Sequence, residues 1–151
     1  MNVVIKEDQL NITNVYYTEP IQNIIMDNSQ FIKIVYSTQD IILNGIYLLV
    51  ELKHITKEKY FKKIKISYDV TVNKSILHKI YEIENQLLNK YNVKHKIQRK
   101  IIYDTLSNGV IKMFPNNEND IINNKNSFIL KISGIWENTT EYGLTYKLLV
   151  I

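Results

Sequence analysis

The chain has 151 residues, 45% hydrophobic and 23% charged, which fits one globular domain (1–151) and excludes disordered and fibrous classes. Cysteine is absent, which excludes disulfides, cysteine–zinc sites, iron–sulfur clusters and thiol nucleophiles. The formal net charge is +4, yet residues 53–100 alone hold 13 basic and 4 acidic side chains. This concentration favours either a polyanionic partner or a solvated lysine-rich face.

The composition is also biased toward residues with AT-rich codons. The chain contains 26 Ile, 18 Asn and 18 Lys, but no Ala, one Arg and only 4 Gly. Such a bias indicates an AT-rich genome. The preference for lysine over arginine therefore says little about the ligand.

Alternating patterns predict antiparallel strands in the first half of the chain, after an N-terminal extension at 1–30. Apolar and polar residues alternate over 31–37, over 46–53 and most regularly over 62–71. A period of two residues is typical of strands with one buried face.

The period changes after Val72, where a long amphipathic helix is predicted over 74–91 with Asn73 as its N-cap. A shorter helix is expected within 97–106. The Asn-rich stretch 116–126 is expected to be an exposed, mobile loop.

The chain closes with two alternating runs around a short polar turn, which predicts a β-hairpin. If Trp136 pairs with Tyr142, Trp136 shares one face with the apolar residues of both strands. Lys131 then lies opposite Lys147 on the other face. Like charges in that position are unfavourable unless the side chains splay into water or an anionic ligand covers them.

Motifs of enzyme chemistry are absent: the sequence contains no GxSxG, HExxH, GxxxxGK[ST] or GxGxxG. His54 and His78 have no carboxylate at metal-ligand spacing, and Glu82 and Glu84 point in different directions on the helix. We therefore expect no catalysis, no metal site and no cofactor.

Lysines interleaved with aromatic residues point instead to single-stranded nucleic acid. Lysines neutralise phosphates, and aromatic rings stack on unpaired bases. Tyr47 and Trp136 are the candidate stacking residues, although the position of Trp136 leaves a core role equally open. The candidate phosphate contacts are Lys33, Lys53, Lys63, Lys65, Lys131 and Lys147.

At the closing hairpin the chain resembles virus-encoded single-stranded DNA-binding proteins of the T-odd phage type, which have relatives in nucleocytoplasmic large DNA viruses. The shared pattern is Ser133-Gly-Ile-Trp136, a short turn, Tyr142-Gly143, and Thr145-Tyr-Lys147. The resemblance implies an OB-fold that binds DNA across a sheet face. The chain lacks the acidic, aromatic-tipped tail common in that family.

We therefore expect a mostly β, OB-like antiparallel barrel with one capping helix that binds single-stranded DNA, in preference to RNA, during viral DNA replication, recombination or packaging. The alternative is a diverged OB-like module for protein interaction or virion structure. Homo-oligomers and viral replication or virion proteins are possible partners. Because the sequence has no long apolar run, we expect a soluble intracellular protein of the replication compartment or virion, with no membrane partner.

Overall fold

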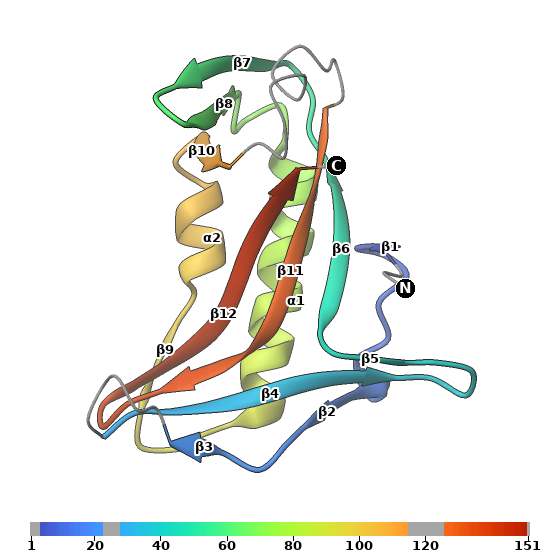
Figure 1. Ribbon diagram of the computed structural model, residues 1–151, viewed down its shortest axis with the longest axis vertical. Helices are drawn as coiled ribbons and strands as arrows, with labels where there is room; N and C mark the ends of the chain where they lie inside the picture. The colour runs from blue at the N-terminus through green and yellow to red at the C-terminus, as the bar shows by residue number, and fades with distance from the viewer. Residues whose placement is uncertain (1–3, 23–27, 115–125, 151) are drawn as a thin grey trace.

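The computed structural model describes residues 4–22, 28–114 and 126–150. In these residues the chain forms a nine-stranded sheet and a three-stranded sheet that share one hydrophobic core with the long helix (Figure 1). The mostly β character and the single long helix are thus confirmed.

The nine-stranded sheet comprises β1 (Ile5–Lys6), β2 (Val15–Tyr17), β3 (Ile21–Gln22), β4 (Gln30–Ser37), β5 (Ile42–Leu43), β6 (Ile46–Glu51), β9 (Ile97–Arg99), β11 (Ser127–Glu137) and β12 (Glu141–Val150). The three-stranded sheet comprises β7 (Ile55–Tyr60), β8 (Lys63–Tyr68) and β10 (Val110–Met113). The helices are the 3-10 turn η1 (Ile12–Asn14), α1 (Lys74–Tyr91) and α2 (Ile101–Leu106).

Strand β11 is the centre of the larger sheet. It pairs with β12 through residues 128–137, with β6 through residues 127–132 and with β4 through residues 134–137. A β-bulge separates these two halves, because the register with β12 shifts between Ile132 and Gly134. The central strand therefore changes its second partner at the bulge.

The sheets do not close into a barrel. Within the described residues, no strand of the smaller sheet is paired with a strand of the larger one. The pairing is also not wholly antiparallel, since β1 runs parallel to β6 and β9 runs parallel to β12.

Most predicted elements have the expected place. Helix α1 covers the predicted range, β6, β8 and the closing hairpin lie within the alternating stretches, and β4 begins one residue before its stretch. The segment 97–106 instead begins as strand β9 and only then forms α2. Strands β7 and β10 were not predicted, and the segment treated as an extension adds β1, β2 and β3 to the sheet. The expected mobile loop, apart from Asn126, lies outside the described residues.

Helix α1 is amphipathic, and its apolar stripe packs into the core. Asn73 precedes the helix as predicted, but its side chain makes no capping bond. Its amide instead accepts from the Lys53 N–H (2.7 Å) and donates to the carbonyls of Lys53 and Asp69. The buried helix positions are Leu77, Ile80, Ile83, Glu84, Leu87 and Leu88. Neither helix of the described residues has the length and apolar character needed to cross a bilayer.

The buried Glu84 joins the two helices. Its carboxylate accepts hydrogen bonds from the backbone N–H groups of Ile102 (3.0 Å) and Tyr103 (2.9 Å), at the start of α2. A carboxylate at a helix N-terminus satisfies unpaired donors and complements the helix dipole. Burial nevertheless raises the pKa of Glu84, and the two backbone bonds only oppose that shift.

A second buried carboxylate, Glu137, lies at the end of β11. It accepts from Tyr91 Oη (2.7 Å), Lys96 Nζ (2.9 Å) and Gln30 Nε2 (3.2 Å). Burial alone would raise the pKa of Glu137, but the bonds from Lys96, Tyr91 and Gln30 outweigh it and lower that pKa below its ordinary value. This carboxylate therefore ties β11 to β4, to the end of α1 and to the segment that follows it.

The burial of α1 predicts a large loss of stability from Leu87→Ala. Leu87 is 0% exposed, so its truncation should leave a cavity and cost about 2–5 kcal/mol in urea unfolding. The exposed Gln86→Ala in the same turn should change stability by less than about 0.5 kcal/mol. Equal effects of the two changes would show that α1 does not pack as described.

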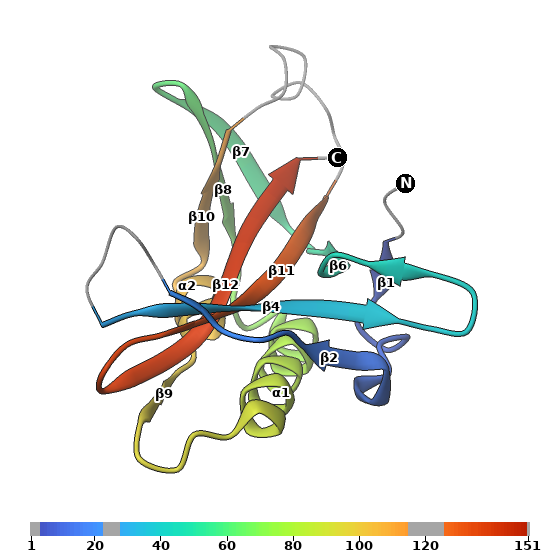
Figure 2. The same ribbon diagram turned by 60° about the horizontal axis from the view of Figure 1, so that its bottom comes forward.

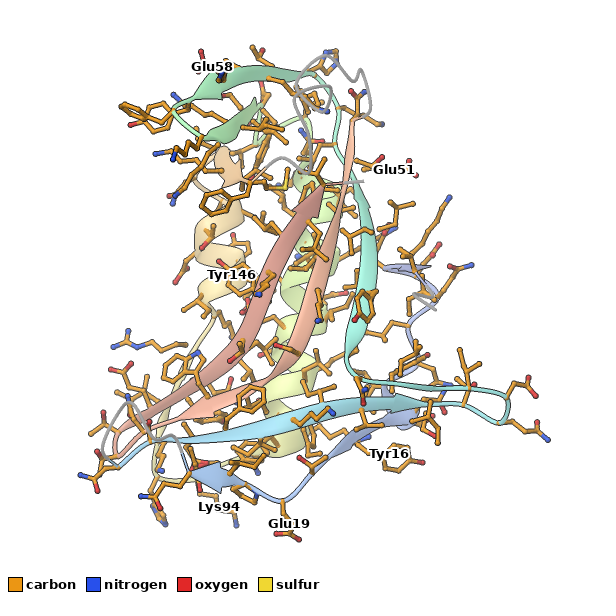
Figure 3. All side chains as sticks on the ribbon, viewed as in Figure 1. Tyr16, Glu19, Glu51, Glu58, Lys94 and Tyr146 are labelled. Carbon is orange, nitrogen blue, oxygen red and sulfur yellow. The ribbon has the colours of Figure 1, made fainter. Side chains whose placement is uncertain are left out.

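The Glu137 contacts predict a specific pH dependence. Because its folded-state pKa is lowered, the stability it contributes is present above the unfolded value near 4.5 and is lost as the pH falls through the folded pKa. Glu137→Gln should lower stability by about 1–3 kcal/mol at neutral pH and flatten this acid limb in thermal melts from about pH 7 to pH 3. Glu19→Gln is the control, since Glu19 is exposed and points away from the protein (Figure 3). An acid limb of unchanged steepness in Glu137→Gln would contradict this role.

Candidate nucleic-acid interface

One face of the larger sheet does not contact the helices. Strands β11 and β12 pass in front of α1 in Figure 1, so this face is turned to the viewer there. We call it the outer face and define it by six residues that alternate with core residues on β4, β6, β11 and β12: Phe31, Lys33, Tyr47, Lys131, Trp136 and Lys147. Five of them are half-buried, and Lys147 is exposed.

The bulge puts Trp136 on the outer face, which corrects the predicted hairpin. Lys131 lies opposite Lys147 as expected, but Trp136 pairs with Gly143 and not with Tyr142. Ser133 is the extra residue; its hydroxyl donates to the Thr145 carbonyl (3.3 Å). One added residue exchanges the two faces of a strand. Of the two roles left open for Trp136, the core role is therefore wrong, and the half-buried ring lies on the outer face.

Two glycines lie beneath aromatic rings on the outer face. A Cβ at Gly143 would lie 2.8 Å from Trp136 Cζ2, and one at Gly134 would lie 2.5 Å from Phe31 Cζ. Phe31 and Trp136 are also cross-strand neighbours. Since the glycines have no side chains, both rings rest directly on the backbone of the sheet and remain partly exposed, as stacking requires.

The lysines of the outer face carry its positive charge. Lys131 Nζ lies 5.5 Å from the centre of the Tyr47 ring, within range of a cation–π interaction. In the described residues, Lys33, Lys131 and Lys147 form no ion pair with a carboxylate. These charges are thus available to an external anion.

The acidic side chain of Glu141, near Trp136, is paired with an arginine. Glu141 accepts two hydrogen bonds from the Arg99 guanidinium, each 2.8 Å. These bonds lower the pKa of the Glu141 carboxyl. The pair therefore adds little net charge beside Trp136.

Lys63 and Lys65 lie on the smaller sheet, within a second set of lysines and rings. Lys112 Nζ lies 4.3 Å and Lys65 Nζ 5.9 Å from the centre of the Tyr60 ring. Lys63 Nζ lies 5.1 Å from the centre of the Phe114 ring. We call this set, with the neighbouring turn residue Phe61, the hairpin cluster: Tyr60, Phe61, Lys63, Lys65, Lys112 and Phe114.

A groove between β12 and β10 connects the outer face to the hairpin cluster. Figure 2 shows β10 beside β12, and a cavity of about 850 Å³ separates them. Lys147 and Leu149 line one side of it, and Lys112 and Phe114 line the other. The opening between the two sheets therefore joins two lysine-bearing surfaces that are distant in sequence.

Lys53 lies apart from these surfaces. It lines a different groove beside the start of α1, together with the carboxylates of Glu7, Asp8 and Glu51. Lys6 also lines that groove, but its three carboxylates outnumber its two lysines, which makes it unfavourable for phosphate. Of the eight predicted residues, the structure places five on the outer face and two in the hairpin cluster, and leaves Lys53 outside both.

Sequence reasoning missed five residues of these surfaces, among them Phe61 in the turn between β7 and β8. Phe31 has the same parity as Lys33 in the alternating pattern, but Gly134, on which its ring rests, comes close to it only in the folded sheet. The alternation of apolar and polar residues is short in β7 and β10. Tyr60 is the last residue of β7, Lys112 lies on β10 and Phe114 follows β10. Only the folded structure brings these residues together with Lys63 and Lys65.

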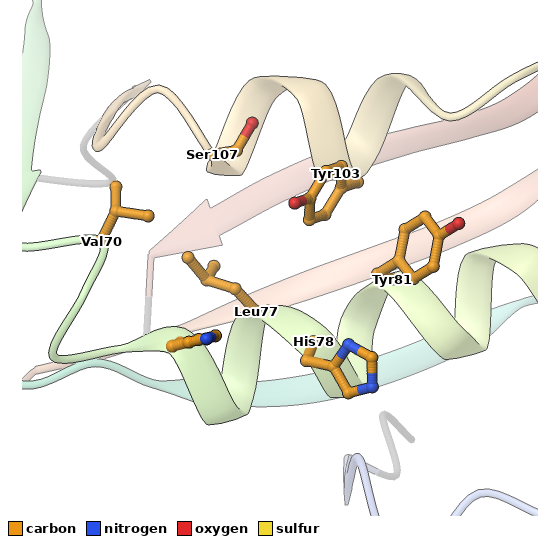
Figure 4. Close-up of a pocket in the computed structure, with 7 residues that line it drawn as sticks. Val70, Leu77, His78, Tyr81, Tyr103 and Ser107 are labelled. Carbon is orange, nitrogen blue, oxygen red and sulfur yellow. The ribbon is translucent and has the colours of Figure 1, made fainter.

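A smaller hollow lies between the helices (Figure 4). It has a volume of about 320 Å³ and an apolar lining with the rings of Tyr81 and Tyr103 at 4.9 Å. His78 on its rim pairs with Glu82 (3.0 Å), four residues later on α1, so the prediction that His78 has no carboxylate at ligand spacing is wrong; both side chains are exposed. In the described part of the chain, no group of three metal-ligating side chains is present.

Comparison of the chain with protein-family models, with curated proteins and with solved structures finds no match.

The partial exposure of Trp136 predicts a modest cost for its removal. Trp136→Ala should lower stability by about 1–2 kcal/mol, whereas Phe128→Ala, at a fully buried position of the same strand, should cost about 3–5 kcal/mol. Urea unfolding of both variants measures the difference. Acrylamide should also quench the fluorescence of this single tryptophan in the native protein; equal stability losses and no quenching would place Trp136 in the core.

Proposed function

We propose that this protein binds single-stranded DNA without catalysis, along a path from the outer face through the β12–β10 groove to the hairpin cluster. We also propose that the fold is an open, OB-like barrel. The shared core of β6, β11 and β12 with β7, β8 and β10, and the long helix against it, support that interpretation.

The observation that carries the proposal is the interleaving of free lysines with half-exposed rings. Tyr47, Phe31 and Trp136 offer ring surface to bases, and Lys33, Lys131 and Lys147 offer charge to phosphates. This combination suits an unpaired strand, because stacking needs bases that are not already paired. The half-buried Leu49, Ile129 and Leu149 lie on the same face beside Lys131, and this apolar patch is the observation that supports the alternative of a protein partner.

The groove supports a path that is longer than one sheet face. Lys147 and Lys112 line the same cavity, and Lys112 contacts the Tyr60 ring. Phosphates can therefore meet lysines in succession as the strand crosses from one sheet to the other. The resemblance of the closing hairpin to viral single-stranded DNA-binding proteins agrees with this proposal and suggests a role in replication, recombination or packaging of viral DNA.

Titration with oligo-dT at several salt concentrations tests the function. If five or six lysines contact phosphates, the plot of log K against log salt should have a slope of about −3.5 to −4. Binding should also quench the Trp136 fluorescence, because its ring lies on the path. A slope near zero, or binding without quenching, would contradict the proposed path.

A matched pair of charge deletions tests which surface binds. Lys131→Gln should weaken binding and reduce the salt slope by about 0.7, the contribution of one single-strand phosphate contact. Lys79→Gln, on α1 and near Glu7 (3.9 Å), should leave both unchanged. Failure of the wild-type protein to bind any oligonucleotide would favour the alternative of a protein-interaction or virion module.

A further inference from the structure

The turn between β7 and β8 holds a phenylalanine in a backbone conformation that suits glycine. Tyr60 and Lys63 are the last paired residues, so Phe61 and Lys62 form a two-residue turn. Phe61 has a φ of 56°. A positive φ at the first of two turn residues is the pattern of a type II′ turn, where glycine is preferred because a Cβ is strained there.

The strain at Phe61 is not compensated by burial, because 82% of the residue is exposed. Codon bias does not explain why phenylalanine occupies this position either. The other non-glycine residues with a positive φ in the described part of the chain are of types that tolerate it: Asn28 (φ 60°), His54 (φ 54°) and Asn92 (φ 45°). Asparagine is abundant in the chain, so one was available for the turn. A strained residue that adds nothing to the core points to a function for its side chain.

The residues next to Phe61 are held in place by ring and charge contacts. Its ring meets the Tyr60 ring edge-on at 4.9 Å, and the Tyr60 ring lies between Lys65 and Lys112. Lys65 also pairs with Glu58 at 3.4 Å. Phe61 is thus an exposed ring at the end of a cluster of lysines, on a two-residue turn with little freedom.

We propose that Phe61 is a second stacking site, which inserts between bases of the single strand after it leaves the β12–β10 groove. This inference rests on the proposed function, since it extends the same path. The path from the groove to Phe61 is continuous, because Lys112 lines the groove with Lys147 and contacts the Tyr60 ring against which Phe61 packs.

The test compares Phe61→Gly, Phe61→Leu and Phe61→Tyr in oligo-dT titrations. Lengths from about 4 to 16 nucleotides span the site sizes of OB folds. The shortest oligonucleotides should bind all variants as they bind the wild type, because they occupy only the outer face. For the longest, Phe61→Gly and Phe61→Leu should weaken binding by about 5- to 150-fold, the loss of one stacked base. Phe61→Tyr should restore it, because it keeps the ring.

Thermal melts of the free variants test the strain separately. Phe61→Gly should melt at the wild-type temperature or about 2–4 °C higher, because it relieves the strained turn. A lower melting temperature would show that Phe61 stabilises the fold, and would overturn the argument from strain.

The outcomes also separate this inference from the function on which it rests. Suppose that the wild type binds oligo-dT and that Lys131→Gln weakens this binding, but that no Phe61 variant weakens it at any oligonucleotide length. Phe61 is then not a stacking site, and the proposed function stands. If the wild type does not bind, both fail. A third outcome is that vesicles containing phosphatidylserine retain the wild-type protein but not Phe61→Gly, while oligonucleotide binding is unchanged. The turn that carries Phe61 would then be a membrane contact instead.

Discussion

The single extra residue in β11 is the constraint on which the rest of the structure depends. Before Ser133 the strand pairs with β6, and after it with β4, so two strands that are close in sequence occupy successive halves of one edge of β11. The same residue reverses which side chains face the core. Ile135 is buried behind the bulge while Trp136 turns outward beside Phe31. Both the bent sheet and its aromatic outer face therefore follow from one local irregularity.

Glu137 attaches the end of α1 to this framework, and Glu84 attaches α2 to α1. The environments of these two buried carboxylates differ. Glu137 meets a lysine and two neutral donors, so its charged form is favoured in the fold. Glu84 meets only backbone N–H groups, and burial disfavours its charge. The stability that Glu137 contributes to the fold is lost as the pH falls through its lowered pKa. The stability that Glu84 contributes is lost as the pH rises through its raised pKa. The two effects oppose each other across the acid range.

Sequence patterns predicted the elements with long, regular alternation, and failed where the decisive contact is distant or the pattern short. Helix α1 was predicted in full because its apolar spacing persists for five turns. The face of Trp136 was wrong because the alternating pattern contains no sign of an unpaired Ser133. Strand β7, with Lys57, Glu58 and Lys59 in succession, shows too little apolar alternation to be recognised. The joining of Lys147 to Lys112 depends on how two sheets pack, which no local pattern records.

The position of β11 in the chain has a consequence for how the protein folds. Phe31 pairs with Trp136, and Ile46 with Ile132, so β11 meets β4 and β6 across separations of 105 and 86 residues in these two pairs. Contacts between such distant segments require large loops to close before they stabilise anything, which slows folding. During synthesis β4 and β6 emerge long before β11, with the strand edges that β11 will cover still unpaired. Until then those edges are open to pairing with another chain, so the period before β11 is made is when this protein is most prone to aggregate.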